Sequence, residues 1–267
     1  YLDAYIPFEG EKPICLLFDR IFEKNTLDVT QLGNVKGIYF NVPHYSIHHL
    51  LIDKKNNYAV NEFGSPYLKG ILDEFLADER LYPMLETNRG CPYACTFCMW
   101  GPVGNAVLRK DENIFTQEVE YIVQKSKQDQ WFFADGNFGM FKDDIGYAKL
   151  LRSVSKKHGF PQKLNFHTAK SNGKRVLEVS NILEDMAPVN IAVQSMDPKV
   201  LKNIKRTNLK DTEIEFLIRE HKKAGRKLIT TDLLLPNSGE SCESHLNSLR
   251  KILSLGFDFV NINILRM

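Results

Sequence analysis

The chain has 267 residues, of which 43% are hydrophobic and 25% charged, the composition of an ordinary globular protein. No stretch approaches the roughly 18 consecutive apolar residues of a membrane-spanning helix, which argues against a membrane or fibrous protein. Lysine and arginine number 35 against 33 acidic residues, and this net charge of +2 gives no indication of a nucleic-acid partner.

The cysteines indicate the redox compartment of the protein, and the two chain ends indicate whether the sequence is a fragment. Five cysteines, three of them crowded into residues 91–98, make a poor disulfide framework and favour a reduced compartment, so we expect a cytoplasmic protein. The chain starts Tyr-Leu-Asp-Ala-Tyr, without methionine or signal peptide, and stops two residues after a predicted strand. We therefore expect a fragment with material missing at both ends.

Residues 1–80 differ in pattern from the rest of the chain. Strands are predicted at 14–18 and 37–40, and a helix at 67–81, where apolar residues recur on one face. We expect an N-terminal α/β extension that packs on the main domain, or the remnant of an accessory domain. A histidine group at 44–49 has no acidic or cysteine partner at ligand spacing, so no metal site is predicted there.

From residue 81 to 267, short apolar runs alternate with segments of helical period, which predicts repeated βα units on a parallel sheet. The interpretation is an α/β fold, a partial (β/α)6 TIM-like barrel truncated at its C-terminus, with an open doubly wound sheet as the alternative. In both, chemistry is expected at the carboxyl ends of the strands. The predicted strands are 84–87, 130–134, 163–167, 189–193, 227–235 and 258–265, and the helices 115–127, 143–157, 173–184, 211–224 and 241–254.

The most informative stretch is Gly90-Cys-Pro-Tyr-Ala-Cys-Thr-Phe-Cys-Met-Trp-Gly101. Its C-x3-C-x2-C spacing can bring three thiolates, from Cys91, Cys95 and Cys98, onto one centre. A structural zinc ion needs four protein ligands, whereas a [4Fe–4S] cluster held by three cysteines keeps one iron free for another molecule. A distant fourth ligand, Cys15 or Cys242, and a purely structural role for the cysteines stay open as alternatives.

This loop, with Phe97 before its third cysteine and a strand before its first, resembles that of the radical S-adenosylmethionine (SAM) superfamily. The segments Glu86-Thr-Asn-Arg-Gly-Cys-Pro, Phe133-Ala-Asp-Gly-Asn-Phe-Gly139 and Val193-Gln-Ser-Met-Asp-Pro are most similar to the cobalamin-associated (B12-binding) members. The resemblance covers about residues 65–267. It implies a [4Fe–4S] cluster whose free iron chelates SAM, and reductive cleavage of SAM to a 5′-deoxyadenosyl radical.

The resemblance also implies which residues surround SAM. A glycine-rich strand end would lie against the methionine amino group, polar residues would reach the ribose or carboxylate, and apolar residues would pack the adenine. An ordinary turn, a solvated helix face and core packing are the alternatives for these positions. The candidates are Gly136 and Asn137 for the amino group, Gln194, Ser195 and Arg206 for the ribose or carboxylate, Lys170 at the same rim, and Leu234 and Phe97 for the adenine.

The resemblance identifies the superfamily more clearly than it identifies the reaction. The resemblance favours cobalamin-assisted methyl transfer to an unknown small-molecule substrate, with electrons from a reductant such as flavodoxin or ferredoxin and no catalytic side chain assigned. The cobalamin motif Asp-x-His-x-x-Gly does not occur in the chain, so that domain lies upstream, binds without histidine, or is lost, and residues 1–80 are a candidate remnant. Alternatives are a cobalamin-independent hydrogen-abstracting enzyme and a non-catalytic zinc or iron–sulfur module.

Overall fold

The computed structural model describes residues 3–6, 10–40, 62–98, 100, 107–187, 189–226 and 228–265. The histidines at 44–49 lie outside these residues, so what the sequence predicts for them stays a prediction. Among the helices described, none has both the length and the apolar character needed to cross a membrane.

Each predicted strand of the main domain is present, although most are shorter than expected. They form two parallel three-stranded sheets with the orders β3-β6-β7 and β10-β9-β8. Pairing continues beyond the strand ends through single bridges, Phe138 with Thr168 and Gln194 with Leu233. The strands are β3 (Met84–Leu85), β6 (Gln130–Phe133), β7 (Lys163–Asn165), β8 (Val189–Asn190), β9 (Ile229–Leu235) and β10 (Phe259–Ile264).

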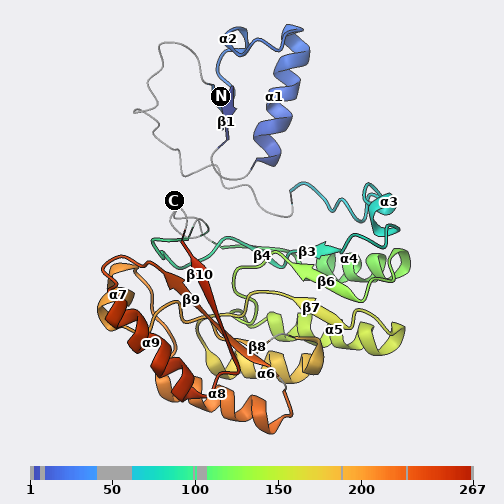
Figure 1. The fold of residues 1–267 in the computed structure, drawn as a ribbon. Helices are drawn as coiled ribbons and strands as arrows, with labels where there is room; N and C mark the ends of the chain where they lie inside the picture. Colours follow the sequence, from blue (N-terminus) through green and yellow to red (C-terminus); the bar gives the residue numbers. More distant parts are fainter. Residues whose placement is uncertain are drawn as a thin grey trace.

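Helices alternate with these strands and cover one side of them (Figure 1). The helix ends coincide with capping residues in the sequence. The carboxylate of Asp111 accepts hydrogen bonds from the N–H groups of Asn113 and Ile114 and so caps the start of the helix at 112–125. Gly159, with a φ of 83°, ends the helix at 144–158. The helices are α4 (Glu112–Lys125), α5 (Asp144–His158), α6 (Gly173–Leu183), α7 (Pro198–Asn203), α8 (Asp211–Lys223) and α9 (Cys242–Leu255), with a 3-10 turn, η2, at Glu184–Met186.

The hydrophobic core has two parts, one behind each sheet. Trp131 and Phe133 of β6 are fully buried against α4 and α5, while Phe132 between them is 38% exposed on the other face. Leu233 of β9 packs in the second part with residues of α8 and α9. This alternation directs every second strand residue away from the helices, toward the inner face of the array.

The described residues up to residue 40 have a secondary structure that differs from the predicted one. The segment 14–18, expected to be a strand, lies inside α1 (Glu11–Lys24), and only the second predicted strand is found, as β2 (Tyr39–Phe40), antiparallel to β1 (Ala4–Tyr5). A short α2 (Val29–Leu32) follows α1, and these elements lie beside the barrel strands rather than among them (Figure 1). A five-residue apolar run cannot by itself distinguish a strand from a helix, which explains the error.

The helix predicted at 67–81 is also wrong in extent. Only α3 (Asp73–Leu76) is helical, and turns precede it. Gly70 has a φ of 69°, a left-handed conformation that interrupts a right-handed helix at this point. The division of the chain near residue 80 stays a prediction.

Candidate functional site

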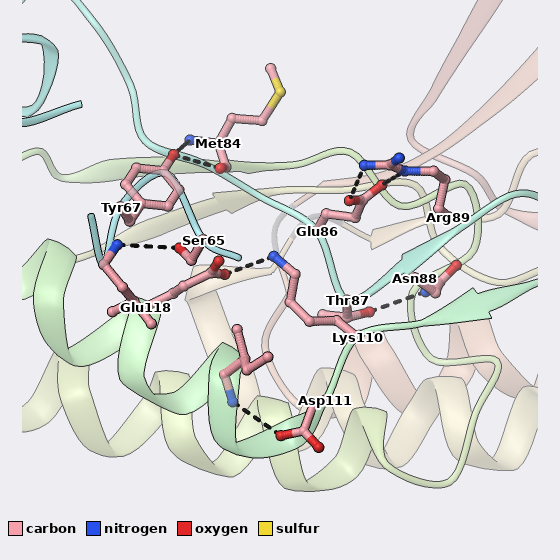
Figure 2. Close-up of polar contacts among 12 residues, drawn as sticks. Ser65, Tyr67, Met84, Glu86, Thr87, Asn88, Arg89, Lys110, Asp111 and Glu118 are labelled. Carbon is pink, nitrogen blue, oxygen red and sulfur yellow. Dashed lines mark hydrogen bonds and ion pairs between the residues drawn. The ribbon is translucent and has the colours of Figure 1, made fainter. Parts of the chain in front are cut away.

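The cysteine loop begins and ends on one short antiparallel pair. In it, β4 (Asn88–Arg89) pairs with β5 (Leu108–Arg109), and the N–H of Lys110 donates to the carbonyl of Thr87 at 2.9 Å. The Lys110 ammonium lies 2.8 Å from the carboxylate of Glu118, which is 1% exposed on α4 (Figure 2). These contacts fix both ends of the loop to the barrel.

A buried carboxylate ties the entrance of the loop to the end of β6. Asp135 is fully buried and accepts hydrogen bonds from the N–H and hydroxyl of Thr87, at 2.9 and 2.6 Å, and from the N–H of Asn88 at 3.1 Å. Burial raises the pKa of Asp135 to about 6, against the opposing effect of these hydrogen bonds. At neutral pH the carboxylate is therefore ionised and holds three donors.

The three cysteines of the loop are free thiols, Cys91 and Cys95 buried and Cys98 half-buried. The N–H of Cys98 donates to the carbonyl of Cys95, and the N–H of Thr96 to that of Ile204, each at 3.1 Å. Within the described ranges no three histidine, cysteine or acidic side chains converge as ligands of one metal ion. In a [4Fe–4S] cluster the thiolates bind different irons, so convergence on a single point is not what that cofactor requires.

Asn137 connects the strand end after β6 to the first cysteine. Its Nδ2 donates to the Sγ of Cys91 at 3.1 Å, and its Oδ1 is buried and has no hydrogen-bond partner among the described residues. The neighbouring Gly136 is approached closely by the ring of Trp100, since a Cβ on this glycine would lie 2.5 Å from it. The close approach expected at Gly136 is therefore made by a tryptophan of the chain itself.

Arg206 lies behind the second cysteine and is 6% exposed. Its Nε donates to the Oδ1 of Asn208 at 2.8 Å and its Nη2 to the carbonyl of Ala192, while Nη1 has no partner in hydrogen-bond geometry among the residues that the structure describes. Burial lowers the pKa of the guanidinium, and the charge and hydrogen bonding of the nearby Cys95 thiol oppose this shift. The buried cation thus faces the cysteine loop.

Gln194 and Ser195, the next two residues predicted to contact SAM, follow the end of β8. Gln194 has a φ of 65°, which a non-glycine residue rarely adopts, and its buried Oε1 has no hydrogen-bond partner in the part of the chain that the structure describes. The hydroxyl of the fully buried Ser195 accepts from the N–H of Asp197 at 3.2 Å, so it is already engaged in the turn. Of the two, Gln194 has the free polar atom.

The remaining candidates lie around the same loop. Lys170 Nζ is 5.8 Å from the ring centre of Tyr93, whose hydroxyl donates to Ser171 at 2.7 Å, so the loop after β7 contacts the cysteine loop. Leu234 is half-buried on the inner face of β9, and its N–H donates to the carbonyl of Gln194 at 3.0 Å. Phe97 is half-buried within the cysteine loop. The structure thus joins this loop to the ends of β6, β7 and β8, while the roles of the individual residues stay predictions.

The sequence interpretation missed a polar network on the inner face of β8, β9 and β10. The carboxylate of Asp232 accepts from Asn190 Nδ2 at 2.9 Å and from Asn261 Nδ2 at 3.1 Å. Buried parallel strands are usually almost entirely apolar. The polar residues Thr230, Thr231 and Asp232 in β9, and Asn261 and Asn263 in β10, were the available signal for a functional inner face.

The comparisons with known proteins agree with this geometry. The family model of the radical SAM superfamily matches residues 85–249. The chain therefore belongs to the radical SAM superfamily.

Two curated relatives show which members of the superfamily the chain is similar to. The 2-(S-pantetheinyl)-carbapenam-3-carboxylate methyltransferase of Streptantibioticus cattleyicolor is 35% identical over 55% of this chain and 23% of its own length. The cobalamin-dependent radical SAM methyltransferase TokK of Streptomyces tokunonensis is 32% identical over 72% of this chain and 29% of its own. The chain thus spans less than a third of either relative.

A solved structure gives the same fold. The radical SAM methyltransferase TsrM from Kitasatospora setae, determined with cobalamin and a [4Fe-4S] cluster bound, superposes with a TM-score of 0.66 at 15% identity. The match covers 99% of this chain and 52% of TsrM. The predicted TIM-like α/β architecture is confirmed by this likeness.

Proposed function

We propose that this chain is the cluster- and SAM-binding core of a radical SAM enzyme that carries out cobalamin-assisted methyl transfer to a small-molecule substrate. Residues 81–267 would form the radical SAM core, and residues 1–80 an extension or the remnant of an accessory domain. The family match supports the cofactor chemistry. The names of the curated relatives support methyl transfer and, for TokK, cobalamin.

One observation carries the proposal. Asn137 Oδ1, Gln194 Oε1 and Arg206 Nη1 are all buried without a hydrogen-bond partner in the described part of the chain, and all belong to residues predicted to surround SAM. A buried polar atom left unpaired costs about 1–3 kcal/mol, so a polar ligand that pairs all three would be favoured. The amino, carboxylate and hydroxyl groups of SAM have the required donors and acceptors.

The residues of the chain would divide the tasks of the site. Cys91, Cys95 and Cys98 would hold the cluster, and the free nitrogen of Arg206 would pair with the carboxylate of SAM. When bound, the cluster and SAM supply a 5′-deoxyadenosyl radical through reductive cleavage of SAM. Leu234 would pack the adenine and exclude water.

The remaining candidates complete this assignment. Lys170 and Tyr93 lie at the rim, where the loops after β4 and β7 meet. Phe97 is proposed as a second adenine contact, Gly136 as a backbone contact of the methionine amino group, and Gln194 and Ser195 as contacts of the ribose or carboxylate.

The partners follow from the chemistry. The cluster needs an electron donor, and we propose a small protein such as flavodoxin or ferredoxin. Thiols that must stay reduced for cluster assembly support a cytoplasmic location. A cobalamin-independent hydrogen-abstracting enzyme is the second candidate, because the superfamily match supports SAM cleavage without specifying cobalamin.

The proposal is tested by anaerobic reconstitution with iron and sulfide. We expect about four irons per chain, as a [4Fe–4S] cluster requires, and an EPR spectrum of the reduced protein that changes when SAM is added. The double variant Cys15→Ala/Cys242→Ala, altered at two exposed positions, is the matched control and should behave like the wild type. Stoichiometric zinc without a cluster would identify the non-catalytic module instead.

A further inference from the structure

We infer that Asn137 is a positioning residue that tunes the cluster: its side-chain amide donates a hydrogen bond to the sulfur of Cys91 and raises the reduction potential of the [4Fe–4S] centre. The inference rests on the proposed cluster and deepens it. It gives Asn137 a function toward the cluster in addition to the SAM contact predicted from the family resemblance.

The contact is short and enclosed. Asn137 Nδ2 lies 3.1 Å from Cys91 Sγ, and the two residues are 2% and 6% exposed. A cysteine bound to iron is a thiolate, which accepts hydrogen bonds but donates none. Cluster ligation therefore requires the Nδ2 end of the amide, and not the Oδ1 end, to face the sulfur.

The backbone on both sides of Asn137 is held in place. Two residues earlier, Asp135 is bound to Thr87 and Asn88. The next residue, Phe138, donates its N–H to the carbonyl of His167 at 2.8 Å. The amide consequently has little freedom to turn away from the sulfur, as a preorganised donor requires.

The direction of the effect follows from charge. One-electron reduction adds negative charge to the cluster and its cysteine sulfurs. An N–H group directed at one of these sulfurs stabilises the reduced form more than the oxidised form, and so raises the potential. The effect is strong in a water-poor site, because the dielectric screening of the N–H dipole is weak there.

The experiment is an EPR-monitored redox titration of the reconstituted protein without SAM, so that no change in SAM contacts can contribute. Asn137→Asp keeps the side-chain shape but replaces the donor with a carboxylate oxygen, and Asn137→Ala removes the group. The matched control is Asn181→Ala, at an exposed position of α6. We expect the midpoint potential to fall in the Ala variant, to fall further in the Asp variant, and to stay unchanged in the control.

Two results would overturn the inference. One is an unchanged midpoint potential in the Ala variant when its iron content equals that of the wild type. The other is loss of the cluster in the Ala variant, because Asn137 would then be needed for assembly rather than for tuning. A wild-type protein that forms no [4Fe–4S] cluster would instead contradict the proposed function itself.

Discussion

Arg206 is the residue for which the structure sharpens the sequence prediction most. Its Nε and Nη2 donate to Asn208 and Ala192, and its Nη1 meets no hydrogen-bond acceptor among the described residues. A hydrogen bond to a charged group contributes about 1.5–3 kcal/mol, so Arg206→Ala should weaken SAM binding roughly 10- to 100-fold while the cluster is retained. Anaerobic isothermal titration with SAM measures this.

The control for that variant lies on the neighbouring helix. Lys202→Ala, at an exposed position of α7, removes a positive charge without touching the site and should bind SAM normally. Equal SAM affinity in Arg206→Ala and wild type would remove Arg206 from the SAM site.

The loop cysteines give a second prediction at this scale. Replacement of Cys91, Cys95 or Cys98 by alanine should abolish the [4Fe–4S] spectrum, since each thiolate binds a separate iron. Iron and sulfide analysis after reconstitution checks the result. A full cluster in Cys95→Ala would contradict the assignment of the three ligands.

At the residue scale, the features that could be predicted are those that depend only on residues close together in the sequence. The cysteine spacing indicates the cluster without any knowledge of the fold. The bond from Asp135 to Thr87, in contrast, joins residues 48 positions apart, and no local pattern specifies such a partner. The unpaired Nη1 of Arg206 likewise depends on where other strands end.

At the scale of helices and strands, the predictions were correct where the hydrophobic periodicity and the capping signals in the sequence are strong. The helix expected at 143–157 is found as α5, Asp144–His158, because a charge pattern and Gly159 mark its ends. The markers of α1, Glu11 in its first turn and Lys24 and Asn25 at its end, lie outside the segment 14–18, and the apolar residues of this segment fit a strand as well as the helix that they form.

The link between β4 and β6 through Asp135 predicts a pH effect. An unfolded aspartate has a pKa of about 3.9, whereas burial holds that of Asp135 at about 6. Between these values the unfolded chain releases its proton first, so the wild type should lose about 2 kcal/mol of unfolding free energy relative to Asp135→Asn as pH rises from 4 to 6, out of about 3 kcal/mol in all. Above about pH 7 the difference should stay constant.

Urea unfolding of the apo protein at several pH values measures this difference. The wild type alone is insufficient, because burial lowers the pKa of His221 to about 4 and its contribution to stability rises with pH over the same range. Asp19→Asn, at an exposed position of α1, controls for the loss of a carboxylate. A difference between wild type and Asp135→Asn that is independent of pH would refute the prediction.

At the scale of the whole molecule, the two-part core determines stability. Leu151 of α5 is fully buried in the first core, so Leu151→Ala should lower the free energy of unfolding by about 2–5 kcal/mol. Leu253 of α9 is 60% exposed, and Leu253→Ala should change it by less than about 1 kcal/mol. Similar effects of the two variants in urea unfolding would show that the core is placed wrongly.

The overall architecture was predictable because alternating strands and helices leave few arrangements open. The inner face was not, since the network around Asp232 becomes visible only when β8, β9 and β10 are aligned. The substrate is even less accessible to sequence reasoning, because residues from several strands and loops meet at such a site.

The central claim is that three loop cysteines hold a [4Fe–4S] cluster that cleaves SAM reductively. Its most direct test is mass spectrometry of the reconstituted protein after reduction with dithionite in the presence of SAM. The account predicts 5′-deoxyadenosine with the wild type and none with the triple variant Cys91→Ala/Cys95→Ala/Cys98→Ala. A wild-type protein that carries the reduced cluster and binds SAM, but forms no 5′-deoxyadenosine, would contradict it.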